Sequence, residues 1–221
     1  GPARRHPAAG AVGEGDHAVD VGIVGEHPAR HHLLGRPRPV LPVGPLRGRV
    51  DQAVLVEAHD DIIVPWNITS QVDTSGEKGL LSIAFSPNFV SDRTFYIHVN
   101  PSSSNVTEIR KYQVMANNYA QADTSTADAI LTIPQPSATN HKGGTLYFDN
   151  SGRLLISLGD GGSTPETAQD NNSLRGKILR IDPSTDAYPS DPAKDYSIPT
   201  ANPFASGSGG LPEIYASGLR N

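Results

Sequence analysis

One histidine, His141, has the residue type and the setting needed for acid–base chemistry. It lies in the stretch Asn140–Gly162, which reads NHKGGTLYFDNSGRLLISLGDGG. An imidazole titrates near neutral pH, so a histidine in a loop held by a rigid scaffold can take or give a proton during a reaction. The same pattern also fits a turn histidine that only caps backbone groups. The local sequence leaves both interpretations open.

The elements that must position His141 form a predicted β-hairpin. Two short apolar runs, Thr145–Phe148 and Leu154–Leu158, are separated by the turn sequence DNSG at 149–152. A strand, an Asn/Gly turn and a second strand are typical of a hairpin. The second strand ends in GDGG at 159–162, where glycines can adopt a positive φ. His141 is therefore predicted at the mouth of a hairpin and not inside a helix.

The chain from Asp61 onward has the pattern of an all-β protein. Helical periodicity is limited to a possible turn at Thr167–Leu174, and the segment Ile181–Leu211 is rich in Pro, Ser, Asp and Gly. A segment of that length is more often a functional surface loop than filler. Many short strands predict a sandwich, a barrel or a propeller. Besides the hairpin, the predicted strands are Gly79–Phe85, Thr94–Val99, Thr107–Met115, Ala129–Ile133, Lys177–Ile181 and Glu213–Ala216.

Residues 1–60 differ from the rest of the chain in composition. They contain six of the eight histidines and seven arginines, but no Ser, Thr, Asn, Lys, Phe, Tyr, Trp or Met. We therefore interpret them as a non-matching segment that is a linker, a foreign fusion or sequence in another reading frame, and that is disordered or frame-shifted. Only Val54–Val56 and Ile62–Val64 resemble strands near this boundary. Residues 61–221 form the predicted folded domain.

Composition excludes several classes of function. With no cysteine in 221 residues, the chain cannot use a thiolate nucleophile, a disulfide or a cysteine zinc site. The net charge of −5 argues against a nucleic-acid partner. No apolar run approaches the ~20 residues that span a bilayer. No apolar segment follows Arg4 and Arg5, so no secretory signal peptide is visible.

Five motifs in order resemble the soluble quinoprotein sugar dehydrogenases, the family of pyrroloquinoline-quinone (PQQ)-dependent glucose and aldose dehydrogenases and their Hedgehog-interacting-protein-like relatives. The resemblance covers about residues 61–221 and implies a six-bladed β-propeller with four antiparallel strands per blade. At roughly 40–50 residues per blade, we expect an incomplete arc of about three to four blades. The motifs are GEKGLLSIAFSPNF (76–89), the Asn140–Gly162 stretch, AQDNNSLRGKILRID (168–182), ANPF (201–204) and EIYASGLRN (213–221).

The resemblance implies roles for five residues. His141 matches the family's general base, which takes a proton from the anomeric hydroxyl of a sugar as hydride leaves for the quinone. Arg220 and Asn221 match the GxRN motif and would bind the cofactor, with Arg220 also facing the substrate. Glu77 and Asn140 match positions beside the substrate. Family members have a glutamine or a glutamate at the position of Glu77, and the glucose enzymes have an aspartate at that of Asn140, so the sugar preference stays open.

The resemblance also implies a bound Ca²⁺ ion in the full-length family. Its ligands follow the GxRN motif there, and this chain ends at Asn221, so we expect no metal ligands here and no activity from this chain alone. Asp160 in GDGG resembles the start of a calcium loop but lacks the further ligands. A turn-stabilising role is the favoured interpretation.

Three functions are open at this point. The first is a PQQ-dependent aldose dehydrogenase of the periplasm or extracellular space, with a small aldose as substrate and an unspecified electron acceptor. The second is a non-catalytic propeller that acts as a scaffold, like the Hedgehog-interacting relatives. The third is a calcium-dependent sugar lactonase. His141 together with Arg220 and Asn221 favours the first, since a scaffold has no reason to keep all three.

Overall fold

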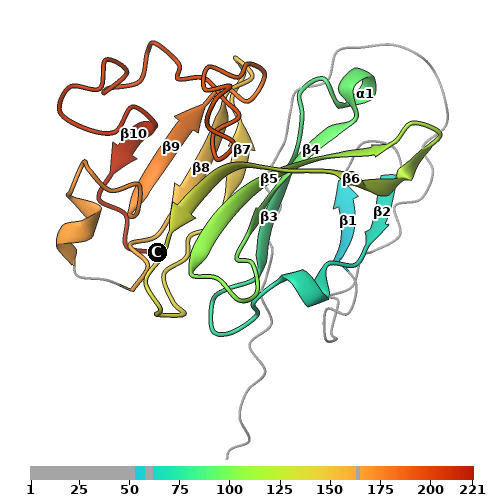
Figure 1. Cartoon of the computed structure of the whole chain (residues 1–221), viewed down its shortest axis with the longest axis horizontal. Coiled ribbons are helices and arrows are strands. Elements are labelled where there is room, and N and C mark those ends of the chain that lie inside the picture. Colours follow the sequence, from blue (N-terminus) through green and yellow to red (C-terminus); the bar gives the residue numbers. More distant parts are fainter. Residues whose placement is uncertain (1–52, 58–61, 163–164) are drawn as a thin grey trace, which may run out of the picture. The chain divides into compact units, whose positions relative to one another are not determined.

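Short alternating strands build two four-stranded antiparallel sheets in the described part of the chain (Figure 1). The computed structural model describes residues 53–57, 62–162 and 165–221. In the first sheet the strand order follows the sequence, β3-β4-β5-β6, and in the second it is β10-β9-β8-β7. Each strand thus pairs with its neighbour in sequence, the arrangement that short turns produce. The all-β prediction is confirmed.

The first sheet contains β3 (Leu80–Phe85), β4 (Thr94–Val99), β5 (Val106–Met115) and β6 (Asn118–Pro134). The second contains β7 (Leu146–Phe148), β8 (Leu154–Leu158), β9 (Lys177–Ile181) and β10 (Ile214–Ser217). A separate hairpin pairs β1 (Ala53–Glu57) with β2 (Ile62–Trp66). The helical turns are η1 (Thr69–Gln71), α1 (Phe89–Asp92) and η2 (Pro165–Ala168).

The predicted strands are present, with one large error in length. Only Ala129–Ile133 was expected to be a strand in its region, yet β6 begins at Asn118. Its first half is polar and mostly exposed, and it pairs with β5 through irregular register, so no apolar alternation marks it. The helix α1 was not predicted, and η2 overlaps only the start of the expected turn at Thr167–Leu174. The hypotheses on the origin of residues 1–60 concern residues that lie almost entirely outside the described ranges.

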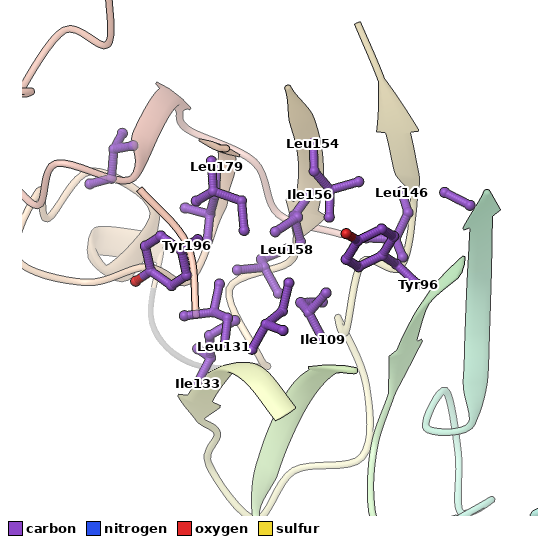
Figure 2. Packing of buried hydrophobic residues seen from close by; sticks show 14 residues of the cluster. Tyr96, Ile109, Leu131, Ile133, Leu146, Leu154, Ile156, Leu158, Leu179 and Tyr196 are labelled. Atoms are coloured by element: carbon purple, nitrogen blue, oxygen red, sulfur yellow. The ribbon is translucent and has the colours of Figure 1, made fainter. Parts of the chain in front are cut away.

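Buried side chains from both sheets pack into one core (Figure 2). Tyr96, Ile109 and Leu131 of the first sheet meet Ile156 and Leu179 of the second. The opposite face of the first sheet is also buried, by a second cluster that includes Phe95 and Tyr112. This two-sided burial explains why every residue of β4 is buried. Each buried Leu or Ile contributes about 1.5–3 kcal/mol, so the core holds the β7–β8 hairpin firmly against the first sheet.

The long segment after β9 is partly anchored in that core. Tyr196 is fully buried and its hydroxyl donates to Glu213 Oε1 at 2.7 Å. Asn202 donates to the carbonyls of Arg180 and Pro212 at 2.8 and 2.7 Å. These contacts give this part of the segment a structural role. A functional role for its surface stays a prediction.

Candidate functional site

The open end of the β7–β8 hairpin brings together the two loops that hold the candidate site. The strands pair with Leu146 opposite Ile156. Pairing continues beyond the strands, because Gly144 N–H donates to the Ser157 carbonyl at 3.1 Å and Gly161 N–H donates to the His141 carbonyl at 3.0 Å. The loop before β7 therefore lies against the loop after β8. The predicted position of His141, at the mouth of the hairpin, is confirmed.

Asp160 lies across this mouth and pairs with His141. The imidazole Nδ1 is 2.8 Å from Asp160 Oδ1, although the residues are 19 positions apart in sequence. The His141 side chain is 15% exposed and that of Asp160 is 1% exposed. Because an ionised carboxylate can only accept hydrogen bonds, Nδ1 carries the hydrogen of the neutral imidazole. This leaves Nε2 with a free lone pair that can accept a proton.

Several contacts keep the Asp160 carboxylate ionised. Burial by itself would raise its pKa, but hydrogen bonds from His141 and from the Gly162 N–H outweigh burial, together with the charge of Arg220 and that of His141 when its ring is protonated. These contacts lower the Asp160 pKa below its ordinary 3.8. The Gly162 N–H donates to Oδ1 at 2.9 Å, which is the turn-stabilising contact expected from the sequence. The pairing with His141 was missed. Extending the hairpin register beyond its apolar residues would have indicated it.

Glu77 reaches the same loop from the segment before β3. Its Oε2 accepts the backbone N–H of His141 at 2.5 Å. Its own N–H donates to the Thr139 carbonyl at 2.8 Å. The structure therefore places Glu77 beside His141 and shows a contact with the backbone that the sequence did not suggest. The contact with substrate that the resemblance implied for Glu77 stays a prediction.

Arg220 lies on the other side of Asp160. Its Nη1 is 3.9 Å from Asp160 Oδ2, and its carbonyl accepts the Asp160 N–H at 2.9 Å. A Cβ on Gly159 would lie 2.3 Å from the His141 carbonyl oxygen and 2.9 Å from that of Arg220, so only glycine lets these backbones approach. The Arg220 side chain is 67% exposed. A guanidinium so exposed is free to bind an anionic or polar ligand.

The two remaining predicted residues are also near. The Asn140 side chain packs on Gly162, where an added Cβ would meet its Oδ1 at 2.2 Å. Asn221 is exposed and follows Arg220 directly. The structure thus gathers His141, Glu77, Asn140 and Arg220 around one hairpin mouth. For Asn221, only its sequence neighbour ties it to the site.

A hollow of about 180 Å³ opens beside Asp160 and Arg220. The polar amide of Gln169, which no sequence motif marked as a site residue, also lines it. A carboxylate, an amide and an exposed guanidinium on one wall are suited to a ligand that carries several oxygens. On this wall the Arg220 guanidinium suits an anionic oxygen, whereas the ionised Asp160 suits a hydrogen-bond donor. The other lining residues are Ala168, Gly218 and Leu219.

Two further properties concern only the described residues. In 53–57, 62–162 and 165–221, no three His, Cys, Asp or Glu side chains are arranged to hold a metal ion. In the same ranges, no helix has the length and apolar character that crossing a membrane requires.

Comparison with known proteins assigns this chain to a family. The family described as Glucose / Sorbosone dehydrogenase matches residues 47–221. This chain belongs to the glucose/sorbosone dehydrogenase family. The resemblance noted from the five motifs is confirmed.

Its relatives include an aldose sugar dehydrogenase and a Hedgehog-interacting protein. The chain is 31% identical to the aldose sugar dehydrogenase YliI of Escherichia coli over 168 residues, which cover 75% of this chain and 42% of the relative. It is 30% identical to the human Hedgehog-interacting protein over 165 residues, which cover 70% of this chain and 23% of that protein. The chain thus spans less than half the length of these relatives.

Solved structures of the same family share the fold. The PQQ-bound aldose sugar dehydrogenase of Streptomyces coelicolor superimposes with a TM-score of 0.56 at 26% identity, covering 77% of this chain and 45% of that one. The apo form of the soluble Escherichia coli enzyme gives 0.55 at 26% identity, covering 72% and 46%. The two sheets are consistent with part of such a fold. The expected number of blades stays a prediction.

Proposed function

We propose that this chain forms part of a PQQ-dependent aldose dehydrogenase, in which a sugar is oxidised at its anomeric carbon to a lactone. The observation that carries the proposal is the pairing of His141 with the buried carboxylate of Asp160 at the hairpin mouth, beside the exposed Arg220. The two sheets would be blades of a six-bladed propeller. We expect the complete protein to act in the periplasm or outside the cell.

His141 would act as the general base. Its Nε2 accepts the proton of the anomeric hydroxyl, and the charge that forms on the imidazole is stabilised by Asp160, which holds Nδ1–H in place. The quinone, when bound, supplies the acceptor for the hydride that leaves the same carbon. The anomeric carbon becomes a carbonyl only when its hydroxyl loses this proton, and His141 removes it.

The other site residues would bind and orient. Arg220 extends a permanent cation from the wall of the hollow and can contact oxygens of the cofactor and the sugar. Asn221 and Asn140 can donate and accept hydrogen bonds at its edge. Calcium, as in the full-length family, would be held by residues other than the five predicted site residues.

A scaffold function is the second candidate, because Hedgehog-interacting proteins are among the relatives. The two candidates differ in what they require of His141 and Asp160. A scaffold needs neither proton transfer nor a fixed imidazole tautomer. A dehydrogenase needs both.

The test is dye reduction by the complete protein, reconstituted with PQQ and calcium and supplied with glucose and other aldoses. His141→Ala should abolish turnover, and Asp160→Asn should lower kcat by about 10²-fold or more, the range of a positioned base. The matched control is Asp149→Asn, at the far end of the same hairpin, where the carboxylate only accepts the Ser151 and Arg153 N–H groups. The control should keep activity within about twofold. Full activity of His141→Ala would reject the mechanism, and no activity with any aldose would favour the scaffold.

A further inference from the structure

We propose that Glu77 is a positioning residue that holds the His141 backbone in the conformation that aims its imidazole. The inference rests on the proposed function only in that His141 is taken to be the base. The resemblance placed Glu77 beside the substrate. The contact that the structure shows is with the backbone of His141.

His141 needs such a hold because its backbone is in an unfavourable region. Its φ is +54°, one of three positive values among the non-glycine residues described. A side chain with a Cβ is disfavoured there, so the conformation persists only where contacts impose it. Relaxation to a negative φ would swing the Cα–Cβ bond and move the ring away from Asp160.

Three contacts oppose this relaxation. Glu77 Oε2 accepts the His141 N–H at 2.5 Å, the Gly161 N–H donates to the His141 carbonyl at 3.0 Å, and Asp160 binds the ring. The last two come from the hairpin itself. Glu77 alone of these three reaches in from the segment before the first sheet, 64 residues earlier in the chain. Of the two contacts to the His141 backbone, this one has a charged acceptor and the other a neutral carbonyl.

Glu77 is itself fixed to the loop that carries His141. Its N–H donates to the Thr139 carbonyl at 2.8 Å. Gly76, with φ of +62°, packs so closely on Thr139 that a Cβ would lie 2.4 Å from the threonine Oγ1. The next residue, Lys78, is held by Asp73 at 2.8 Å. The Glu77 carboxylate therefore extends from an anchored backbone and accepts the His141 N–H group.

This positioning role and a role that depends on charge make different demands on residue 77. Positioning needs an acceptor oxygen at the right reach, whether charged or neutral. A role that depends on charge needs the carboxylate and tolerates a different reach. Glu77→Gln keeps the acceptor and loses the charge, whereas Glu77→Asp keeps the charge and shortens the side chain by one methylene, about 1.5 Å.

The experiment measures hydrogen exchange of the His141 amide by NMR in the full 221-residue chain, labelled with ¹⁵N. Loss of a hydrogen bond to a charged group should speed exchange by about twentyfold or more in Glu77→Ala and Glu77→Asp. Glu77→Gln should speed it by no more than about fivefold, since a neutral acceptor replaces a charged one. Amides of Ile156 and Leu179, in the core strands, should be unchanged in all variants.

The comparison separates the inference from simpler explanations. Glu77→Gln and Glu77→Ala change the charge equally, so an electrostatic effect on exchange chemistry cancels between them. If Glu77→Ala does not fold, the Gln and Asp variants alone decide. Unchanged exchange in Glu77→Asp, or faster exchange in Glu77→Gln than in Glu77→Asp, overturns the inference. Because exchange needs neither cofactor nor sugar, its outcome is independent of whether the complete protein is a dehydrogenase.

Discussion

A buried histidine in the first sheet makes the stability of this chain depend on pH. His98 of β4 has no exposed surface, and neither ring nitrogen has a hydrogen-bond partner in the part of the chain that the structure describes. Strand alternation puts it on the same face as Tyr96, toward the core shared with the second sheet. Burial lowers the His98 pKa from 6.5 to about 3. The folded state therefore contains the neutral imidazole.

The direction and size of the effect follow from proton linkage. Below pH 6.5 the unfolded chain binds a proton at His98, while the folded chain does so only near pH 3. The free energy of unfolding must fall as pH drops from 6.5 toward 3, by at most about 1.4 kcal/mol per pH unit. Between pH 7 and pH 5 the loss is about 2 kcal/mol. That is a large part of the 5–15 kcal/mol typical of a folded domain.

Urea unfolding at pH 7 and pH 5, on the wild-type chain and on His98→Leu, measures this loss. The wild type should lose about 2 kcal/mol more than the variant over this interval. Asp73, whose pKa is lowered to about 2, titrates below the interval and does not contribute. His141 and the histidines near the N-terminus are common to both proteins and cancel. Equal pH dependence of the two proteins would refute the claim that His98 is buried and neutral.

The remaining predictions concern packing and charge. Gly159→Ala should lower the free energy of unfolding by about 3 kcal/mol, because its Cβ would overlap two backbone carbonyls. Gly152 has a φ of +75° but open space around it, so Gly152→Ala should lower the free energy of unfolding by only about 1–2 kcal/mol in the same urea assay. Equal losses in the two variants would contradict the packing argument. Lys142 is 1% exposed, its pKa is lowered chiefly by burial, and its ammonium group donates to Gln135 at 3.4 Å. Lys142→Met should therefore raise the free energy of unfolding by about 1 kcal/mol, and a decrease would show that the ammonium group is well paired. The hydrogen bond from Lys78 is the chief cause that lowers the Asp73 pKa to about 2. The ionised Asp73 therefore adds on the order of 1 kcal/mol to the free energy of unfolding above pH 3.8, and this contribution disappears as pH falls toward 2. Asp73→Asn should remove this acid sensitivity in unfolding curves at about pH 5 and about pH 2.5.

The parts of the fold that are readable in the sequence are those where apolar residues define a strand. The runs that became β4, β8 and β9 are mostly apolar and bounded by turn residues, and each was predicted with its observed bounds. The first half of β6 has no such signal, because Ala122 is its one buried side chain and the backbone pairs with β5 through irregular register. Tyr119 there is 38% exposed, and its ring meets only the edge of the core, at Phe89 of α1.

The candidate site divides in the same way. The position of His141 was predicted from a local pattern, since the hairpin that holds it is encoded by neighbouring residues, whereas its role as a base was implied by the family resemblance. The pairing of Asp160 with His141 depends on how the strand register continues beyond the apolar residues, where no sequence pattern marks it. The contact from Glu77 depends on how two sheets pack, and Gln169 on how a distant turn meets Arg220. Such contacts between distant residues follow only from the assembled structure.

The most direct test of the central claim is the tautomer of His141, read from two-dimensional ¹H–¹⁵N NMR of the chain labelled with ¹⁵N-histidine. In mildly alkaline buffer, where imidazole side chains are neutral, the spectrum should show the hydrogen on Nδ1 and a bare Nε2, and Asp160→Asn should abolish this preference. A His141 that carries its hydrogen on Nε2 in the wild-type chain, or that is unaffected by Asp160→Asn, would contradict the account.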